Sequence, residues 1–211
     1  EGRDPPGAVT LSRSQRHLLV RGGTVVTMDP ERRVLSGDVL VTDGRIVAVG
    51  PDLPAPGATR LLDAGGCIVV PGLIQGHVHL GQTLFRGLGE DRRLLEWLAE
   101  AIWPLEAAHT EESAYWTGVI GGMEAIRAGT TSILDIGLVH GMNGVFRAIR
   151  DLGLRAWTGK LLMDRGDGAP ARLLEDPRVS IEESRELASQ WHGAAEDRIR
   201  EFERRQKDTN K

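Results

Sequence analysis

The chain has 211 residues, 40% of them hydrophobic and 27% charged, which is enough to bury the core of one large domain or two small ones. Its formal net charge of -4 is spread over both signs and forms no basic stripe, so we expect no nucleic-acid partner. The single cysteine, Cys67, excludes an intrachain disulfide framework, and no apolar run approaches the roughly 20 residues that span a bilayer, so we expect a cytoplasmic protein without membrane contact.

The two ends of the chain differ from its middle. Residues 1–16 show no apolar periodicity and contain two prolines, so we expect a disordered arm there. Residues 201–211 are almost wholly charged and polar, which predicts a polar tail that adds little to a core.

Residues 17–67 have the pattern of a small β domain. Short apolar runs with strand-like alternation occur in "HLLVRGGTVVTM" and "DVLVTDGRIVAVG". In the second stretch, Asp43 and Gly44 stand between two alternating runs. Because both residues tolerate the positive φ of a tight turn, this pair predicts a β-hairpin.

Residues 68–200 alternate between strand and helix patterns. Strands are expected in "CIVVPGLI", "TTSILDIG" and "LRAWTGKLLM", and helices in "TEESAYWTGVIGGMEAIRAG", "GMNGVFRAIRDLG" and "SIEESRELASQWHG". This order predicts βαβ units with a parallel sheet, and therefore an α/β fold. The stretch "RIREFERRQKDTNK" lacks the apolar character of a buried strand, so we expect about three βα units.

The first of these helices has clear local signals. Thr110 can cap its amino end, and Gly129 stands where a left-handed stop is expected. Apolar residues at helical spacing predict one stripe that packs on the core: Tyr115, Val119, Met123 and Ile126.

A pair of histidines follows the first strand of the α/β region, in "VVPGLIQGHVHLGQTLFRG". His77 and His79 are two positions apart, so in a strand both side chains leave the same face. Either one alone could be a packed core histidine. Together, at the carboxyl end of a strand in a parallel sheet, they predict a metal site. Imidazole suits zinc, iron, nickel or copper, so the residues alone do not identify the ion.

The same stretch, with the hairpin before it and "LLEWLAEAIWPLE" and "EAIRAGTTSILDIG" after it, resembles the amidohydrolase superfamily. The resemblance extends from about residue 17 to about residue 200, and within the superfamily it is to the cytosine, S-adenosylhomocysteine and 5′-deoxyadenosine deaminases and the triazine chlorohydrolases. It implies a TIM-like barrel with one divalent metal, zinc most expected and iron possible. It also implies a small β-sandwich built from both ends of the chain, with residues 17–67 as its amino-terminal part.

A complete barrel of this kind needs about 250 residues, so residues 68–200 are expected to form only its first part. The resemblance assigns metal ligands to His77 and His79 alone. The family's other ligands and its proton-shuttling glutamate belong to later strands, so the catalytic residues are expected outside this sequence.

The implied activity is therefore that of a parent enzyme: hydrolytic deamination of an amino-heterocycle such as a purine nucleoside, in a possible homo-oligomer. The alternatives are a truncated, non-catalytic fragment and a chlorohydrolase or other C–N hydrolase of the same branch.

Several other residues are candidates for substrate contact. Glu106, in "IWPLE", matches the position that holds ribose hydroxyls in the resembled deaminases, and otherwise it is a solvated acid. His140 follows the second strand, and its alternative interpretation is a satisfied loop histidine. Trp97 resembles a pocket wall but has the spacing of a core residue. Asp135 could brace a ligand histidine or cap a turn.

Three further residues are given no role in the chemistry. His109 and His192 adjoin polar helix segments and are expected at the surface. Lys160 lies in the third predicted strand, and no chemistry is assigned to it.

Overall fold

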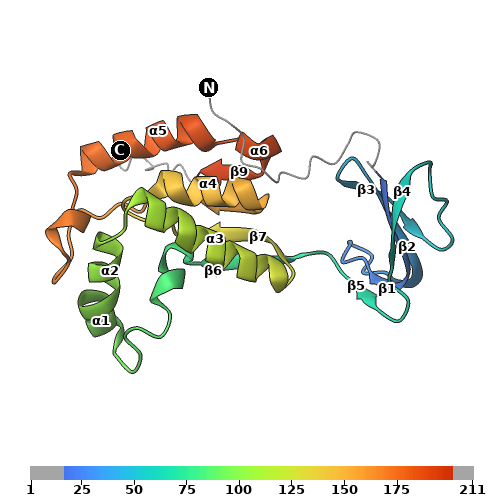
Figure 1. Ribbon diagram of the computed structural model, residues 1–211, viewed down its shortest axis with the longest axis horizontal. Helices are drawn as coiled ribbons and strands as arrows, with labels where there is room; N and C mark the ends of the chain where they lie inside the picture. Colours follow the sequence, from blue (N-terminus) through green and yellow to red (C-terminus); the bar gives the residue numbers. More distant parts are fainter. Residues whose placement is uncertain (1–16, 202–211) are drawn as a thin grey trace, which may run out of the picture. The chain divides into compact units, whose positions relative to one another are not determined.

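The computed structural model describes residues 17–201, which form two compact units with a boundary between Pro71 and Gly72 (Figure 1). Each unit is described by itself. The predicted arm, residues 1–16, and the predicted tail beyond residue 201 lie outside the described residues. No helix in the described part of the chain is long and apolar enough to cross a membrane.

The first unit is a five-stranded sheet with the order β3-β2-β1-β4, in which β5 also pairs with β1. Its strands are β1 (His17–Val26), β2 (Val34–Thr42), β3 (Arg45–Gly50), β4 (Thr59–Asp63) and β5 (Ile68–Val69). The predicted hairpin is confirmed, because β2 and β3 pair antiparallel across Asp43 and Gly44, which have φ values of 49° and 75°. The described residues form one sheet here, so the β-sandwich stays a prediction.

The second unit contains a four-stranded sheet in which every pair of neighbours is parallel. Its strands, in spatial order, are β6 (Leu73–Val78), β7 (Thr130–Asp135), β8 (Arg155–Thr158) and β9 (Ile199–Glu201). The α/β fold and its parallel sheet are therefore confirmed. The stretch predicted as one strand in "CIVVPGLI" is divided: β5 belongs to the first unit and β6 begins only at Leu73.

Three βα units are present as expected, but the prediction that "RIREFERRQKDTNK" contains no buried strand is wrong. β9 pairs with β8, and Ile199 is fully buried in the core. A short parallel strand needs only one buried apolar residue when its backbone is hydrogen-bonded to a neighbouring strand. Here charged residues surround that apolar residue, so the sequence shows no alternating strand pattern.

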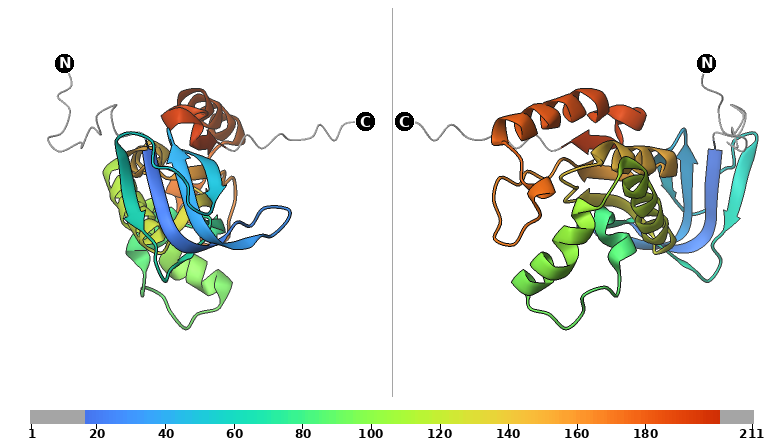
Figure 2. Two further views of the ribbon diagram at one scale, coloured as in Figure 1. Left: turned by 90° about the vertical axis from the view of Figure 1, so that its right-hand side faces the viewer. Right: turned by 60° about the vertical axis from the view of Figure 1, so that its left-hand side comes forward.

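Three long helices accompany this sheet: α3 (Glu111–Arg127), α4 (Met142–Leu152) and α5 (Pro177–Trp191). The core lies where α3, α4 and α5 meet β7, β8 and β9, and it includes Ile133, Val145, Phe146, Ile149, Ala156, Trp191 and Ile199. Short helical segments occupy the connections: η1 (Leu80–Phe85), α1 (Leu94–Trp97), η2 (Leu98–Ile102), α2 (Trp103–Ala107), η3 (Ala171–Leu173) and α6 (Ala194–Asp197). Figure 2 shows α1, α2 and the segment between β8 and α5 at the same end of this unit.

The predicted core stripe of α3 is partly wrong. Met123 is 50% exposed and Ile126 is 42% exposed. The residues that α3 buries are instead small: Ala114, Thr117, Gly118, Gly122 and Ala125. A Cβ at Gly118 would lie 2.9 Å from the Ala148 Cβ of α4, so the two helices are in close contact and only small residues fit between them.

Candidate metal and substrate site

The two histidines at the end of β6 face each other. Their Nε2 atoms are 3.0 Å apart and their ring centroids 5.0 Å apart, while the intervening Val78 packs against the core. This is the arrangement that strand alternation requires. His77 is exposed, whereas His79 is partly buried. Burial, and then the neighbouring His77, lowers the pKa of His79, which favours the neutral ring.

The geometry of this pair fits two positions of a metal site. Two nitrogens bound to one zinc ion at about 2.0–2.1 Å with a tetrahedral angle lie about 3.3 Å apart, close to the observed separation. The second nitrogen of His79, Nδ1, is buried without a hydrogen-bond partner in the structure. Among residues 17–201, no cluster of three or more His, Cys, Asp or Glu side chains could hold a metal. The described residues therefore offer two candidate ligands.

Glu106 lies inside α2 and is only 8% exposed, so its interpretation as a solvated acid before a helix is wrong. Its Oε1 accepts a hydrogen bond of 2.9 Å from Nε2 of Gln82 in η1. Burial raises the pKa of Glu106, and the hydrogen bond from Gln82 opposes that shift only in part. The carboxyl group is thus held in place by the segment that begins directly after His79.

A cavity of about 560 Å³ adjoins His79. Its lining includes His79, a candidate metal ligand, together with Gln82 and Trp97. Trp97 is half-buried at the end of α1 and does not belong to the core of this unit. A concave site with an aromatic wall and a few polar groups has the usual composition of a small-molecule pocket.

His140 lies at the carboxyl end of β7, as predicted, but both of its nitrogens face protein groups. Its Nε2 donates a hydrogen bond of 2.6 Å to the carbonyl oxygen of Arg172, and its Nδ1 is 3.5 Å from Oε1 of Glu175. These contacts favour the interpretation as a satisfied loop histidine. Substrate contact by His140 stays a prediction.

Asp135 is buried and joins the ends of three strands. Its carboxylate accepts hydrogen bonds from the backbone N–H of Leu80 at 2.8 Å, from that of Gly137 at 3.1 Å and from the Thr158 hydroxyl at 2.7 Å. Burial raises the pKa of Asp135, although all three donors oppose the shift. Asp135 therefore positions the residue that follows His79 through its backbone, in addition to forming the predicted turn with Gly137.

The expectation that His109 is a surface residue is wrong. It is 4% exposed, stacks on Phe85 with ring centroids 5.0 Å apart, and donates from Nε2 to the carbonyl oxygen of Gly81 at 2.8 Å. Its Nδ1 is 2.9 Å from Oγ of Ser113, and burial lowers its pKa. The i, i+4 spacing of His109 and Ser113 was the available signal. His192, by contrast, is exposed as predicted.

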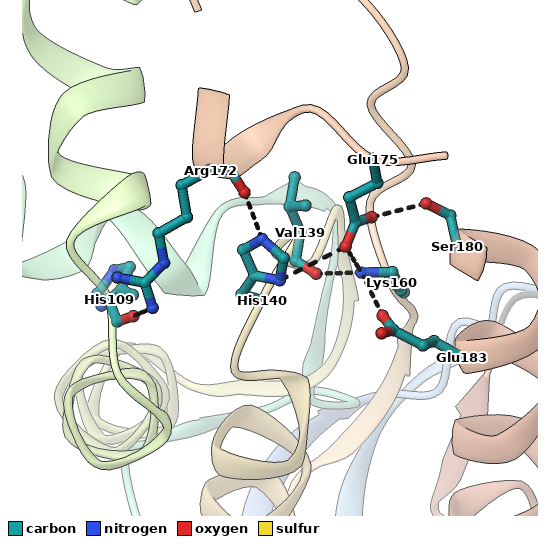
Figure 3. Close-up of polar contacts among 8 residues, drawn as sticks. All are labelled: His109, Val139, His140, Lys160, Arg172, Glu175, Ser180 and Glu183. Carbon is teal, nitrogen blue, oxygen red and sulfur yellow. Dashed lines mark hydrogen bonds and ion pairs between the residues drawn. The ribbon is translucent and has the colours of Figure 1, made fainter. Parts of the chain in front are cut away.

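Lys160 was assigned no chemistry from the sequence, yet its buried ammonium group lies within a polar cluster. Figure 3 shows its ammonium group among the carbonyl oxygen of Val139 and the carboxylates of Glu175 and Glu183. Its side chain is 2% exposed. These partners come from three different segments, so no local spacing in the sequence reveals them.

Residues 68–206 match the model of the amidohydrolase family. The chain is 44% identical over 158 residues to a 5-methylthioadenosine/S-adenosylhomocysteine deaminase of Syntrophobacter fumaroxidans, a match that covers 73% of this chain and 36% of the relative. It is 36% identical over 183 residues to a 5′-deoxyadenosine deaminase of Methanothermobacter thermautotrophicus, covering 87% and 40%.

Solved structures of similar proteins show the same fold. Escherichia coli guanine deaminase superposes with a TM-score of 0.75 at 29% identity, covering 87% of this chain and 45% of that one. An adenosine deaminase of Xanthomonas campestris with bound zinc superposes with a TM-score of 0.76 at 27% identity, covering 89% and 42%. The chain thus spans less than half the length of each of these proteins. With two thirds of its residues matched by the family model, the chain belongs to the amidohydrolase family.

Proposed function

We propose that this chain carries part of the active site of a metal-dependent hydrolase that deaminates an amino-heterocycle such as a purine nucleoside. The observation that carries the proposal is the convergence of the His77 and His79 Nε2 atoms, 3.0 Å apart, beside a cavity at the carboxyl end of β6. Parallel α/β folds place their chemistry at this end. In this proposal, β6 to β9 are the first strands of a TIM-like barrel.

His77 and His79 would hold one divalent ion. Zinc is the first choice, because an adenosine deaminase of similar fold contains it, and iron is the second. When bound, the ion would supply Lewis acidity for the activation of water. Because two imidazoles leave a catalytic zinc site short of its usual three protein ligands, further groups must complete it.

The described residues also support a role in substrate binding. Glu106 does not line the cavity itself, but its partner Gln82 does, and Gln82 donates to one Glu106 oxygen, which leaves the other oxygen as a candidate acceptor for sugar hydroxyls. Trp97 also lines the cavity, where its indole ring could stack on a planar heterocycle. Both residues lie in the connection that follows β6, Trp97 in α1 and Glu106 in α2.

The test uses protein expressed from the complete reading frame. Ammonia release is measured with adenosine, 5′-deoxyadenosine, 5-methylthioadenosine, S-adenosylhomocysteine and guanine, before and after treatment with a chelator. We expect release from at least one substrate, its loss on chelation, and its loss in His77→Ala and His79→Ala. The exposed His192 provides a matched control, because His192→Ala should retain activity. Deamination that persists in both histidine variants would refute the metal assignment.

A further inference from the structure

Lys160 stands two residues beyond β8, and its ammonium group is held within the protein. It donates hydrogen bonds to the carbonyl oxygen of Val139 and to Glu175 Oε1 at 2.9 Å, and it forms an ion pair with Glu183 Oε2 at 2.9 Å (Figure 3). Glu175 is buried with it, with a side chain that is 9% exposed, whereas the Glu183 side chain is 47% exposed. One buried cation therefore neutralises two carboxylates that would otherwise repel each other.

Glu175 connects this cation to the segment between β8 and α5. Its Oε2 accepts a hydrogen bond of 2.7 Å from the Ser180 hydroxyl, and its backbone N–H donates to the Met163 carbonyl oxygen at 2.9 Å. The Lys160–Glu175 ion pair thus joins the two ends of the connection, which we call the β8–α5 loop, residues 161–174. A loop held at both ends by a buried charge pair has little freedom to open.

The β8–α5 loop contacts the two preceding loops through Arg172. The carbonyl oxygen of Arg172 accepts from His140 at 2.6 Å, and its guanidinium donates to the carbonyl oxygen of His109 at 3.1 Å (Figure 3). His109 in turn donates to the carbonyl oxygen of Gly81. The contacts therefore run without interruption from the β8–α5 loop to η1.

This series of contacts ends at Glu106, the candidate substrate-binding residue. Gly81 is followed in η1 by Gln82, whose side chain holds Glu106 at 2.9 Å. Nothing in the series passes through the ring nitrogens of His77 or His79. The contacts from Lys160 to Glu106 and the candidate metal ligands therefore lie at the same end of the sheet, but they do not depend on each other's side-chain atoms.

We propose that Lys160 is a positioning residue for the substrate pocket. Its buried ammonium holds the β8–α5 loop in place and, through Arg172 and His109, holds η1 and thereby Glu106. The inference rests on the proposed function only in taking Glu106 as a group that contacts substrate. Loss of the ammonium should weaken substrate binding and leave the histidine pair intact.

The test again uses protein from the complete reading frame. In Lys160→Met, hydrogen exchange of residues 161–174 and of residues 80–85 should accelerate by about tenfold or more, since two carboxylates lose their common cation. The double variant Lys160→Met with Glu175→Gln removes one of those charges and should recover part of the protection. Arg165→Met is the matched control, because Arg165 lies in the same loop with a 90% exposed side chain.

Kinetics give a readout that a general loss of structure would not reproduce. With the best substrate, Lys160→Met should raise KM by about tenfold, with kcat changed by less than about threefold and metal content unchanged. If this variant does not fold, Glu183→Gln removes the more exposed partner and should move exchange and KM the same way by a smaller factor. Three results would overturn the proposal. They are faster hydrogen exchange in residues 161–174 alone, a parallel loss of kcat and bound metal, and exchange rates and KM equal to those of Arg165→Met. If the wild-type protein deaminates nothing, the proposed function fails, and the exchange at residues 80–85 alone decides the positioning role.

Discussion

Asp135 provides the sharpest test of how this end of the sheet is held together. Its carboxylate accepts from three donors that stand at or just beyond the ends of three strands: Leu80 after β6, Gly137 after β7, and Thr158 at the end of β8. The change Asp135→Asn keeps the size of the side chain but turns one acceptor oxygen into an NH₂ donor. At one of the three contacts, two hydrogen-bond donors must then face each other without an acceptor.

The structure indicates which contact is lost. Oδ2 serves both Gly137 and Thr158, so the amide is expected to keep its oxygen there and to turn its nitrogen towards the N–H of Leu80. A buried N–H left without a partner costs about 1–3 kcal/mol of the free energy of unfolding. Burial raises the pKa of Asp135, so the neutral Asn side chain avoids part of the cost of a buried charge, which acts against this loss. Asp135→Ala loses all three contacts and should cost at least about 3 kcal/mol.

The free energy of unfolding is measured from urea titrations at constant m value, with Asp164→Asn as the control. Asp164 has a side chain that is 51% exposed, so its variant should stay within about 0.5 kcal/mol of the wild type. The expected order of stability is control, then Asp135→Asn, then Asp135→Ala. An Asp135→Asn protein as stable as the control would refute the view that this carboxylate joins the three strands.

Two further predictions concern the candidate site. Because burial raises the pKa of Glu106, ionisation of this group destabilises the folded state. Glu106→Gln should therefore have a larger free energy of unfolding than the wild type at neutral pH. This difference should disappear as the pH falls from above the raised pKa to below the ordinary value of 4.5. The same titration in the exposed Glu182→Gln should show no such trend. The 211-residue chain by itself should show no metal-dependent deamination, since residues 17–201 offer no cluster of three metal-ligating side chains. Chelator-sensitive turnover by this chain would contradict that expectation.

The features that could be predicted from the sequence depend on residues close together in the chain. The histidine pair needs only the two-residue period of a strand, and the β2–β3 hairpin needs only Asp43 and Gly44. In both cases the backbone conformation of a few residues determines where the side chains lie. The alternation of strands and helices is likewise a local signal, and it predicted the parallel sheet.

The features that sequence analysis missed depend on contacts between segments that lie far apart in the chain. Met123 and Ile126 have helical spacing, but α3 approaches α4 so closely that glycine and alanine occupy the contact and the larger residues are left outside. Periodicity shows that a helix has an apolar stripe, but not whether a neighbouring helix approaches it closely enough to exclude large side chains. β9 was missed for a related reason, because its pairing with β8 is a backbone contact that its charged sequence does not indicate.

Lys160 and His109 extend this reasoning to the candidate site itself. His109 was expected at the surface and Lys160 was given no role, yet each is buried among partners from segments that follow different strands. The candidate metal ligands lie at the end of β6, where the sheet supports them directly, whereas Glu106 lies in a connection that polar contacts and the Phe85–His109 stack hold to other segments. If Glu106 binds substrate as proposed, substitutions in the β8–α5 loop should change substrate preference while the histidine pair stays in place. Within one family, this division would let relatives keep their metal site and differ in the heterocycle that they accept.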